Sequence, residues 1–274
     1  MIKRIKFAGS AAVIALFAVS TFSVTSCSSG KSGVPKGSAE LRVNLEQGDA
    51  YNVEMAISQT VFTDETMLEK MMESETKLYS SASVSSAQEN VYTLETKINR
   101  VVIDQTAQGM EINYDSDQGE PEDMIGAMVH QQMAPLMENS MTTKVDMMGK
   151  VIKQDTTGEE SELMDGGSYL IQFPEEYVSV GSTWTKDGVG LMDDANVTYT
   201  VKEIQSDNVI LDVTSNTQQA EEGVDLNIEI KGTITIDRKT GWPVMQDLKV
   251  VMSGEAEGQP MYMIQNIQMK SVKQ

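Results

Sequence analysis

The stretch that decides the predicted fold is NVYTLETKINRVVIDQTAQGMEINYDS, residues 90–116. Apolar and polar residues alternate along it, and the alternation breaks at Gln108 and Gly109, where the glycine allows a tight turn. A period of two on both sides of a turn predicts an antiparallel β-hairpin with one buried face and one solvated face. Four positions of the first strand share the face predicted to be buried: Tyr92, Leu94, Thr96 and Ile98.

The same alternation runs through most of the chain after residue 40. Residues 41–62, LRVNLEQGDAYNVEMAISQTVF, repeat the hairpin pattern around a turn at Gly48 and Asp49. Further alternating segments lie at 196–218, 224–257 and 261–272. We therefore expect a mostly β protein of the α+β class.

Two pairs of segments suggest an internal repeat. Residues 91–116 and 197–215 both run strand, turn, strand and end on a serine. Residues 143–154 and 233–250 both carry an Asp, a Gly shortly after it, and a Val that re-enters a strand. The repeat predicts two related halves, each an antiparallel, curved, half-barrel-like sheet, at 41–160 and 161–274.

One or two helices are expected to pack on these sheets. The first lies at about residues 121–138, where Pro121 suits the first turn and Asp123 sits where the helix dipole favours negative charge. The second is expected within residues 64–81, where apolar side chains fall near one face of a helix.

The start of the chain predicts export and anchoring. Basic residues precede an uncharged apolar run, as in a secretory signal, and the run is too rich in Ser, Thr and Gly for a membrane span. The sequence VTSC at 24–27 resembles a bacterial lipobox. The resemblance implies that residues 1–26 are removed and that Cys27 carries diacylglycerol and an N-acyl chain. Residues 27–40 then form a flexible tether rich in Ser, Gly, Lys and Pro.

The residues after Cys27 bear on where the protein is anchored. No Asp follows Cys27 directly, which favours the outer membrane, and no early acidic pair marks export to the cell surface. We expect an outer-membrane lipoprotein that faces the periplasm, with the cell surface as the alternative. The expected partner is then the membrane, through the anchor.

Charge and composition exclude several functions. The chain has 41 acidic and 21 basic residues and a formal net charge of −20, so its surface repels nucleic acid. With one His and one acylated Cys, we expect no thiol protease, Ser-His-Asp triad or His-rich zinc centre. We expect no enzymatic activity and no cofactor besides the acyl chains on Cys27.

Methionine is unusually frequent, with 20 residues against 5 Phe. Methionines recur along the first predicted helix at spacings of four or five, which predicts a stripe of thioether side chains: Met124, Met128, Met133 and Met137. The stripe has three interpretations: adaptable packing, a surface for apolar ligands or partners, and a Cu(I) site. The Cu(I) site would use Met128, His130 and Met133.

The lipobox and five further motifs carry a resemblance to a known family: LRVNLEQGDAY, INYDS, TTKVDMMGKV, IQFPEEYVSVGSTW and ITIDRKTGWPV. On these motifs the chain resembles a family of bacterial lipoproteins of unknown function. The resemblance implies no catalytic residues. The pattern is also loosely similar to the half-barrel sheets of lipoprotein carriers, in which helices close an apolar cavity.

Together these patterns predict a non-catalytic binding protein of the cell envelope, with a hydrophobic small molecule or an envelope protein as its partner. The residues expected to line the ligand site are Met124, Met128, Met133, Met137, Trp184 and Trp242. Cu(I) binding and a purely structural or interaction role are the two alternatives.

Overall fold

The structure is a computed structural model that describes residues 37–63, 66–67, 69–107, 109–119, 121, 123–156, 170–187, 196–221, 224–256 and 259–274. The described chain is mostly β, with one α-helix, α1 (Met124–Glu138), and one 3-10 helix, η1 (Ser116–Gln118). The predicted mostly β, α+β class is confirmed. The predicted boundary at 160–161 lies outside the described residues.

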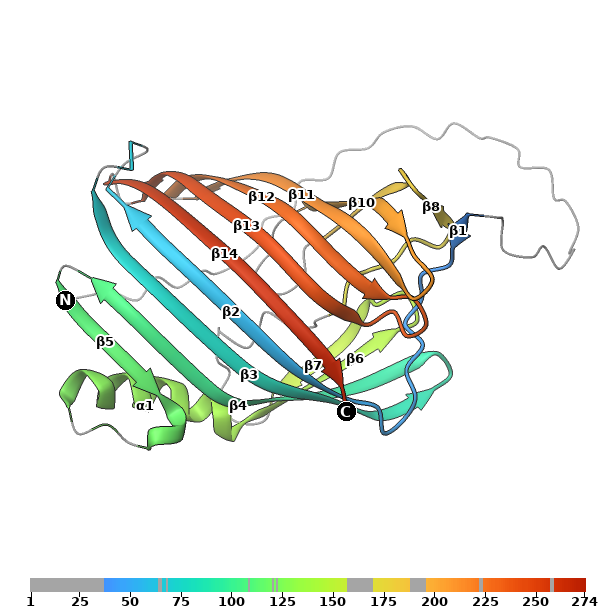
Figure 1. Ribbon diagram of the computed structural model, residues 1–274, viewed down its shortest axis with the longest axis horizontal. Helices are drawn as coiled ribbons and strands as arrows, with labels where there is room; N and C mark the ends of the chain where they lie inside the picture. Colours follow the sequence, from blue (N-terminus) through green and yellow to red (C-terminus); the bar gives the residue numbers. More distant parts are fainter. Residues whose placement is uncertain are drawn as a thin grey trace, which may run out of the picture. The chain divides into compact units, whose positions relative to one another are not determined.

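Twelve strands form one antiparallel sheet (Figure 1). The first half of the chain supplies β2 (Ala50–Phe62), β3 (Lys70–Gln88), β4 (Val91–Ala107), β5 (Met110–Asp115), β6 (Ser140–Asp146) and β7 (Val151–Thr156). The second half supplies β9 (Thr183–Asp187), β10 (Asn196–Ile204), β11 (Asn208–Glu221), β12 (Val224–Asp237), β13 (Pro243–Ala256) and β14 (Gln259–Lys273). Two short strands pair separately, β1 (Ser38–Ala39) and β8 (Val178–Ser179).

The strand order joins the two halves into a single sheet. It runs β7-β6-β4-β3-β2-β14-β13-β12-β11-β10-β9, with β5 beside β4. The two sheets expected from the sequence are therefore halves of one sheet. The cause is the pairing of β14 with β2, which extends from Lys273 opposite Tyr51 to Tyr262 opposite Phe62.

The hairpin predicted at 90–116 is confirmed as β4 and β5. Ala107 lies opposite Met110, and Gly109 between them has a φ of 81°, which glycine adopts without strain. The positions predicted to share a buried face do so, with Tyr92, Leu94 and Thr96 buried and Ile98 half-buried.

The hairpin predicted at 41–62 is wrong in its first arm. Its second arm is β2, but residues 41–46 are an extended segment outside the sheet. Leu41, Val43 and Leu45 alternate into the core, as they would in a strand. Their backbone, however, bonds to turns of the sheet, with Val43 N–H donating to the Met147 carbonyl at 2.8 Å.

The second helix, predicted within 64–81, is also wrong. From Lys70 onward this segment is β3. The strand pairs with β2 on one side and with β4 on the other along nearly its whole length. Pairing on both sides overrides the helix propensity of its Met, Glu and Lys residues.

The repeated Asp–Gly segments form matching turns, one between β6 and β7 and one between β12 and β13. In each turn an aspartate Oδ1 accepts backbone N–H groups: Asp146 from Met148 and Lys150, and Asp237 from Lys239 and Thr240. Each turn also contains a glycine with positive φ, 79° at Gly149 and 71° at Gly241. The local sequence repeat thus corresponds to a repeated turn.

Candidate functional site

The sheet has two chemically different faces. We call the face that carries the buried Tyr51 and Val53 the core face, and the opposite one the outer face. Residues directly opposite each other on paired strands share a face, so the register assigns every strand position. Among the described core-face side chains of β2, β3, β4 and β14, Lys273 at the strand end is the sole charged one. The outer face of these strands carries Glu54, Glu73, Glu75, Lys77, Glu95, Lys97, Arg100, Asp104 and Lys270.

Two extended segments cover one end of the core face. Residues 41–45 bond to both Asp–Gly turns, through Val43 to Met147 and through Asn44 to Thr240. Residues 170–173 bond to the first turn, where Phe173 N–H donates to the Met148 carbonyl at 2.7 Å. Leu41, Leu170 and Phe173 are almost fully buried here.

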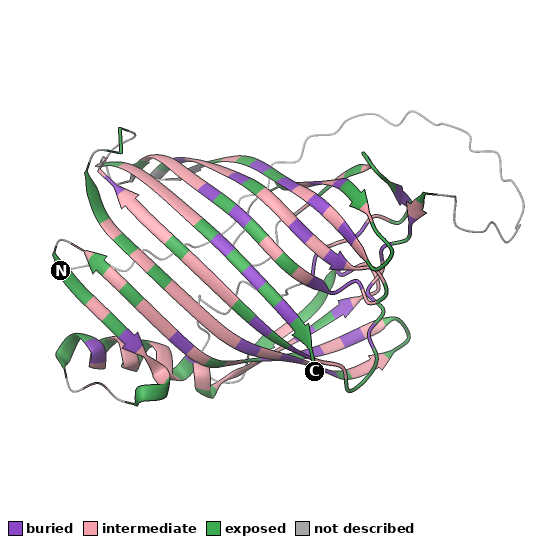
Figure 2. Ribbon diagram, in the orientation of Figure 1, coloured by how far each residue is buried: buried purple, intermediate pink, exposed green. Residues whose placement is uncertain are grey.

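Burial declines along the strands away from this cover. On β2, Tyr51 and Val53 are 3% and 2% exposed, whereas Met55, Ile57, Gln59 and Val61 are half-buried. Figure 2 shows the same change along the central strands, where buried residues at one end give way to half-buried ones. The end of the core face that lies away from the two covering segments is therefore still partly accessible to solvent.

Three cross-strand rows make up this region, which we call the distal core face. The isoleucine row consists of Ile267, Ile57, Thr76 and Ile103. The glutamine row consists of Gln265, Gln59, Ser74 and Gln105. The methionine row consists of Met252, Met263, Val61, Met72 and Ala107. All are half-buried except Ile267, which is buried.

A side-chain contact links the glutamine and methionine rows. Gln105 Nε2 donates to Met72 Sδ at 3.3 Å, which places both side chains on the same face. Met252 and Met263 lie directly opposite each other on β13 and β14. Met72, Met252 and Met263 thus lie in one row of the sheet, and none of them belongs to the helix. The sequence signal was Met at alternating positions, as in Met261 and Met263, but only the strand register brings such residues together.

The predicted helix packs on the core face beside these rows. It begins at Met124, because the Asp123 carboxylate accepts the Gly126 N–H at 2.8 Å and caps the first turn. Leu136 and Met133 pack against core-face residues of β4 and β6, Ile98 and Met141. His130 Nδ1 lies 3.1 Å from the Tyr114 hydroxyl of β5.

The predicted methionine stripe is split between two faces of α1. Met124 and Met128 are 80% and 57% exposed, whereas Met133 and Met137 are half-buried. The physical reason is the spacing of five between Met128 and Met133, which rotates the second side chain by about 140° around a helix of 3.6 residues per turn.

The helix geometry does not favour the Cu(I) alternative. Met128 and His130 line one hollow, but Met128 and Met133 point away from each other around the helix, so the three predicted ligands are not brought together. Across the described residues, no group of three or more His, Cys, Asp or Glu side chains could hold a metal ion.

The described helices include none that is long and apolar enough to span a membrane.

Both tryptophans belong to the packed end of the core face. Trp242 is 1% exposed, and its Nε1 donates to Ser271 Oγ at 2.7 Å. Trp184 is half-buried, stacks on Tyr199 with ring centroids 5.5 Å apart, and donates to the Gln172 carbonyl at 2.9 Å. The structure therefore does not group them with the methionines of the helix.

Cys27, the predicted lipidation site, lies outside the described residues.

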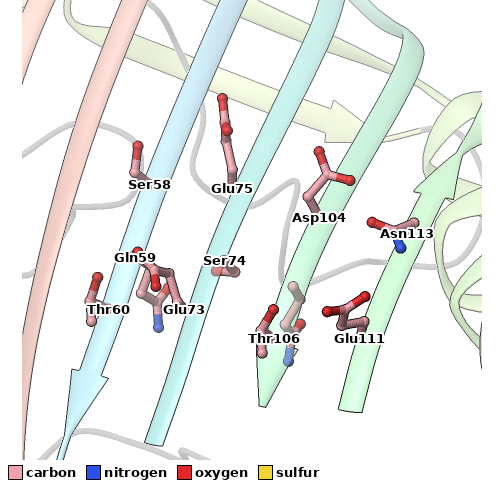
Figure 3. Close-up of a pocket in the computed structure, with 11 residues that line it drawn as sticks. Ser58, Gln59, Thr60, Glu73, Ser74, Glu75, Asp104, Thr106, Glu111 and Asn113 are labelled. Carbon is pink, nitrogen blue, oxygen red and sulfur yellow. The ribbon is translucent and has the colours of Figure 1, made fainter. Parts of the chain in front are cut away.

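A hollow of about 400 Å³ lies over β2 to β5 (Figure 3). Most residues that line it belong to the outer face, and three belong to the glutamine row: Gln59, Ser74 and Gln105. Glu75 lies opposite Ser58 and Asp104, and Glu73 lies on the neighbouring row. Lysines accompany both glutamates, with Lys70 Nζ at 2.9 Å from Glu73 and Lys77 Nζ at 2.9 Å from Glu75. The outer-face part of this lining is thus charged and solvated, whereas the part from the glutamine row is uncharged.

Comparisons with known proteins show a partial family match. Residues 154–243 match a family of unknown function (DUF6263). This range contains IQFPEEYVSVGSTW and nearly all of ITIDRKTGWPV, two of the motifs that carried the resemblance described above. No curated protein sequence matches the chain significantly.

Several solved structures match the chain. A structure described as lipid–protein interactions in lipovitellin has a TM-score of 0.51 and 10% identity, over 84% of this chain and 26% of that chain. DynF from the dynemicin biosynthesis pathway of Micromonospora chersina has a TM-score of 0.24 and 8% identity, over 88% and 90%. An outer membrane channel from Pseudomonas putida F1 has a TM-score of 0.28 and 8% identity, over 88% and 100%. The chain spans about a quarter of the lipovitellin chain, and at this identity the likeness is one of fold: a large antiparallel sheet.

Proposed function

We propose that this protein is a lipid-anchored protein of the bacterial cell envelope whose distal core face binds an apolar or amphiphilic ligand without chemical change. The observation that carries the proposal is the decline of burial along the core face. Apolar side chains continue beyond the covered end but keep accessible surface, as Ile57, Val61 and Met263 do. A ligand that removes a further 100 Å² of apolar surface from water gains about 2.5 kcal/mol.

The charge distribution supports the same ligand class. Apart from Lys273 at the strand end, the described charged side chains of β2, β3, β4 and β14 lie on the outer face. The distal core face offers thioether, aliphatic, amide and hydroxyl groups. Methionine side chains are flexible and polarisable, which suits them to apolar ligands of varied shape. The fold likeness to lipovitellin, a protein whose structure is described in terms of lipid–protein interactions, adds support at the level of fold.

The envelope location is part of the proposal and rests on the sequence. The lipobox-like VTSC at 24–27 predicts acylation of Cys27, and the absence of an Asp after it favours the outer membrane, facing the periplasm. Cells fed a labelled fatty acid should incorporate the label into the wild-type chain and not into Cys27→Ala. Label in both chains, or in neither, contradicts the anchor.

Binding is tested with a neutral lipophilic fluorophore, N-phenyl-1-naphthylamine, added to the delipidated chain in detergent-free buffer. We expect saturable uptake. Val61 and Thr60 are neighbours on β2 that point to the core face and the outer face, so Val61→Lys and Thr60→Lys form a matched pair. Val61→Lys should weaken uptake at least tenfold, and Thr60→Lys by less than twofold, with both variants checked for folding by circular dichroism.

Two outcomes overturn the ligand-binding proposal. One is the absence of saturable uptake by the wild-type chain. The other is an equal effect of Val61→Lys and Thr60→Lys, because the fluorophore would then bind without regard to the face. Either result favours the structural or protein-interaction role, which crosslinking in cells would then test.

A further inference from the structure

The glutamine row gives the distal core face a polar band between two apolar ones. Gln265, Gln59, Ser74 and Gln105 occupy adjacent positions on β14, β2, β3 and β4. The isoleucine row lies two residues to one side along each strand, and the methionine row two residues to the other. With about 4.8 Å between strands and about 3.4 Å per residue, the polar band is about 14 Å long and each apolar row lies about 7 Å from it.

Among the described residues, the amide groups of this band have unused hydrogen-bonding capacity. Gln105 Nε2 donates to a thioether sulfur, Met72 Sδ, which is a weak acceptor. In the described part of the chain, the side chains of Gln59 and Gln265 have no hydrogen-bond partner, although both are half-buried. A ligand carbonyl would give these amides a stronger acceptor than a thioether and would not require a compensating charge.

The band is also uncharged, which restricts the ligand. Transfer of a carboxylate or phosphate into a partly desolvated site is costly unless a cation pairs with it. The rows that flank the band consist of aliphatic and thioether side chains with a single hydroxyl, Thr76. A free fatty acid bound with its head group on the band would therefore lose hydration without gaining an ion pair.

We infer that the glutamine row selects acylated ligands whose polar group is an uncharged ester or amide, and disfavours the free carboxylic acid of the same chain length. The inference rests on the proposed function and specifies its ligand class. The acyl chain lies on the isoleucine or methionine row, and the ester or amide carbonyl accepts hydrogen bonds from the amide nitrogens of Gln59 and Gln265.

The test is competition against N-phenyl-1-naphthylamine on the full delipidated chain at pH 8, with monolauroylglycerol and laurate as competitors below their micellar concentrations. Monolauroylglycerol should displace the probe at a concentration at least tenfold lower than laurate does. The variants are Gln59→Leu and Gln265→Leu on the core face, with Gln268→Leu on the outer face of β14 as the matched control. Each core-face variant should lower the affinity for monolauroylglycerol about three- to tenfold, since one or two hydrogen bonds are lost. The affinity for the probe should stay within twofold of wild type.

The outcomes separate this inference from the proposed function. If the probe binds but the two competitors act equally, or if Gln268→Leu weakens monolauroylglycerol as much as Gln59→Leu does, the ester selectivity is wrong and the apolar site stands. If the probe does not bind at all, the proposed function itself fails. Stronger competition by laurate than by monolauroylglycerol contradicts the inference directly.

Discussion

Tyr51 and Trp242 stack face to face, with ring centroids 4.1 Å apart and planes 12° from parallel. Tyr51 lies near the start of β2, and Trp242 follows the turn between β12 and β13. Burial raises the pKa of Tyr51 to about 12, since the phenolate would have to form among apolar groups. The stack therefore holds the turn between β12 and β13 against the start of β2, at the covered end of the core face.

Replacement of Trp242 tests how much this contact stabilises the fold. We expect Trp242→Phe to lower the free energy of unfolding by about 2 to 4 kcal/mol, because it leaves a cavity and removes the donor to the buried Ser271 hydroxyl. Urea titration followed by circular dichroism measures the change. Trp184→Phe is the control and should cost less than half as much, because Trp184 is half-buried and water can replace its bond to Gln172. Equal losses of unfolding free energy in the two variants would contradict a larger contribution from Trp242.

The glycines of two turns give a second matched pair. Gly241 has a φ of 71°, and a Cβ there would lie 2.2 Å from the Arg42 carbonyl oxygen of the covering segment. Gly48 has a φ of 94° with nothing within 4 Å of the same position. We expect Gly48→Ala to cost about 1 kcal/mol from backbone strain alone, and Gly241→Ala at least about 3 kcal/mol because the covering segment must also shift. Thermal melts of both variants check this, and similar melting temperatures would contradict the close docking of that segment.

The strands could be predicted from the sequence, but their partners could not. Alternation of Leu41, Val43 and Leu45 predicts one buried face correctly. The same pattern fits a segment that lies on a sheet and bonds to its turns, so periodicity alone does not distinguish the two. The error at Lys70 to Ser81 has a different cause, since local helix propensity competed with pairing to two long neighbours that lie elsewhere in the sequence.

The candidate site required the register of the sheet. Gln59 and Gln265 are 206 positions apart in the sequence and directly opposite in the sheet, so no local pattern relates them. The methionine excess was visible in the composition, but its interpretation as a helical stripe followed sequence spacing instead of strand pairing. What the sequence did indicate was a methionine-rich surface suited to apolar ligands or partners, which it placed on the helix.

The ion pair between Arg100 and Asp115 predicts a defined dependence of stability on pH. The guanidinium bonds to both carboxylate oxygens, at 2.9 and 2.7 Å, and this hydrogen bonding lowers the pKa of Asp115. Because the folded pKa is below the unfolded value of about 3.9, the pair's contribution is present above that pH and is lost as the pH falls through the folded pKa. Asp115→Asn should therefore lower the urea midpoint at pH 7, and the difference from wild type should shrink at pH 3. Arg100→Gln should also lower the urea midpoint at pH 7, and its difference from wild type should also shrink at pH 3. A difference in midpoint that persists at pH 3 would show that the loss does not come from the carboxylate charge.

Substitutions on the two faces of α1 distinguish packing from metal binding as the role of its methionines. Met133 packs against Leu136, Ile98 and Met141, so Met133→Ala should lower the free energy of unfolding by about 1 to 2 kcal/mol. Met128 is 57% exposed, and Met128→Ala should stay within about 0.5 kcal/mol of wild type. A Cu(I) site built from Met128, His130 and Met133 predicts instead that Cu(I) raises the melting temperature of the wild-type chain and of neither variant. We expect no such rise, because the side chains of Met128 and Met133 lie on opposite sides of the helix.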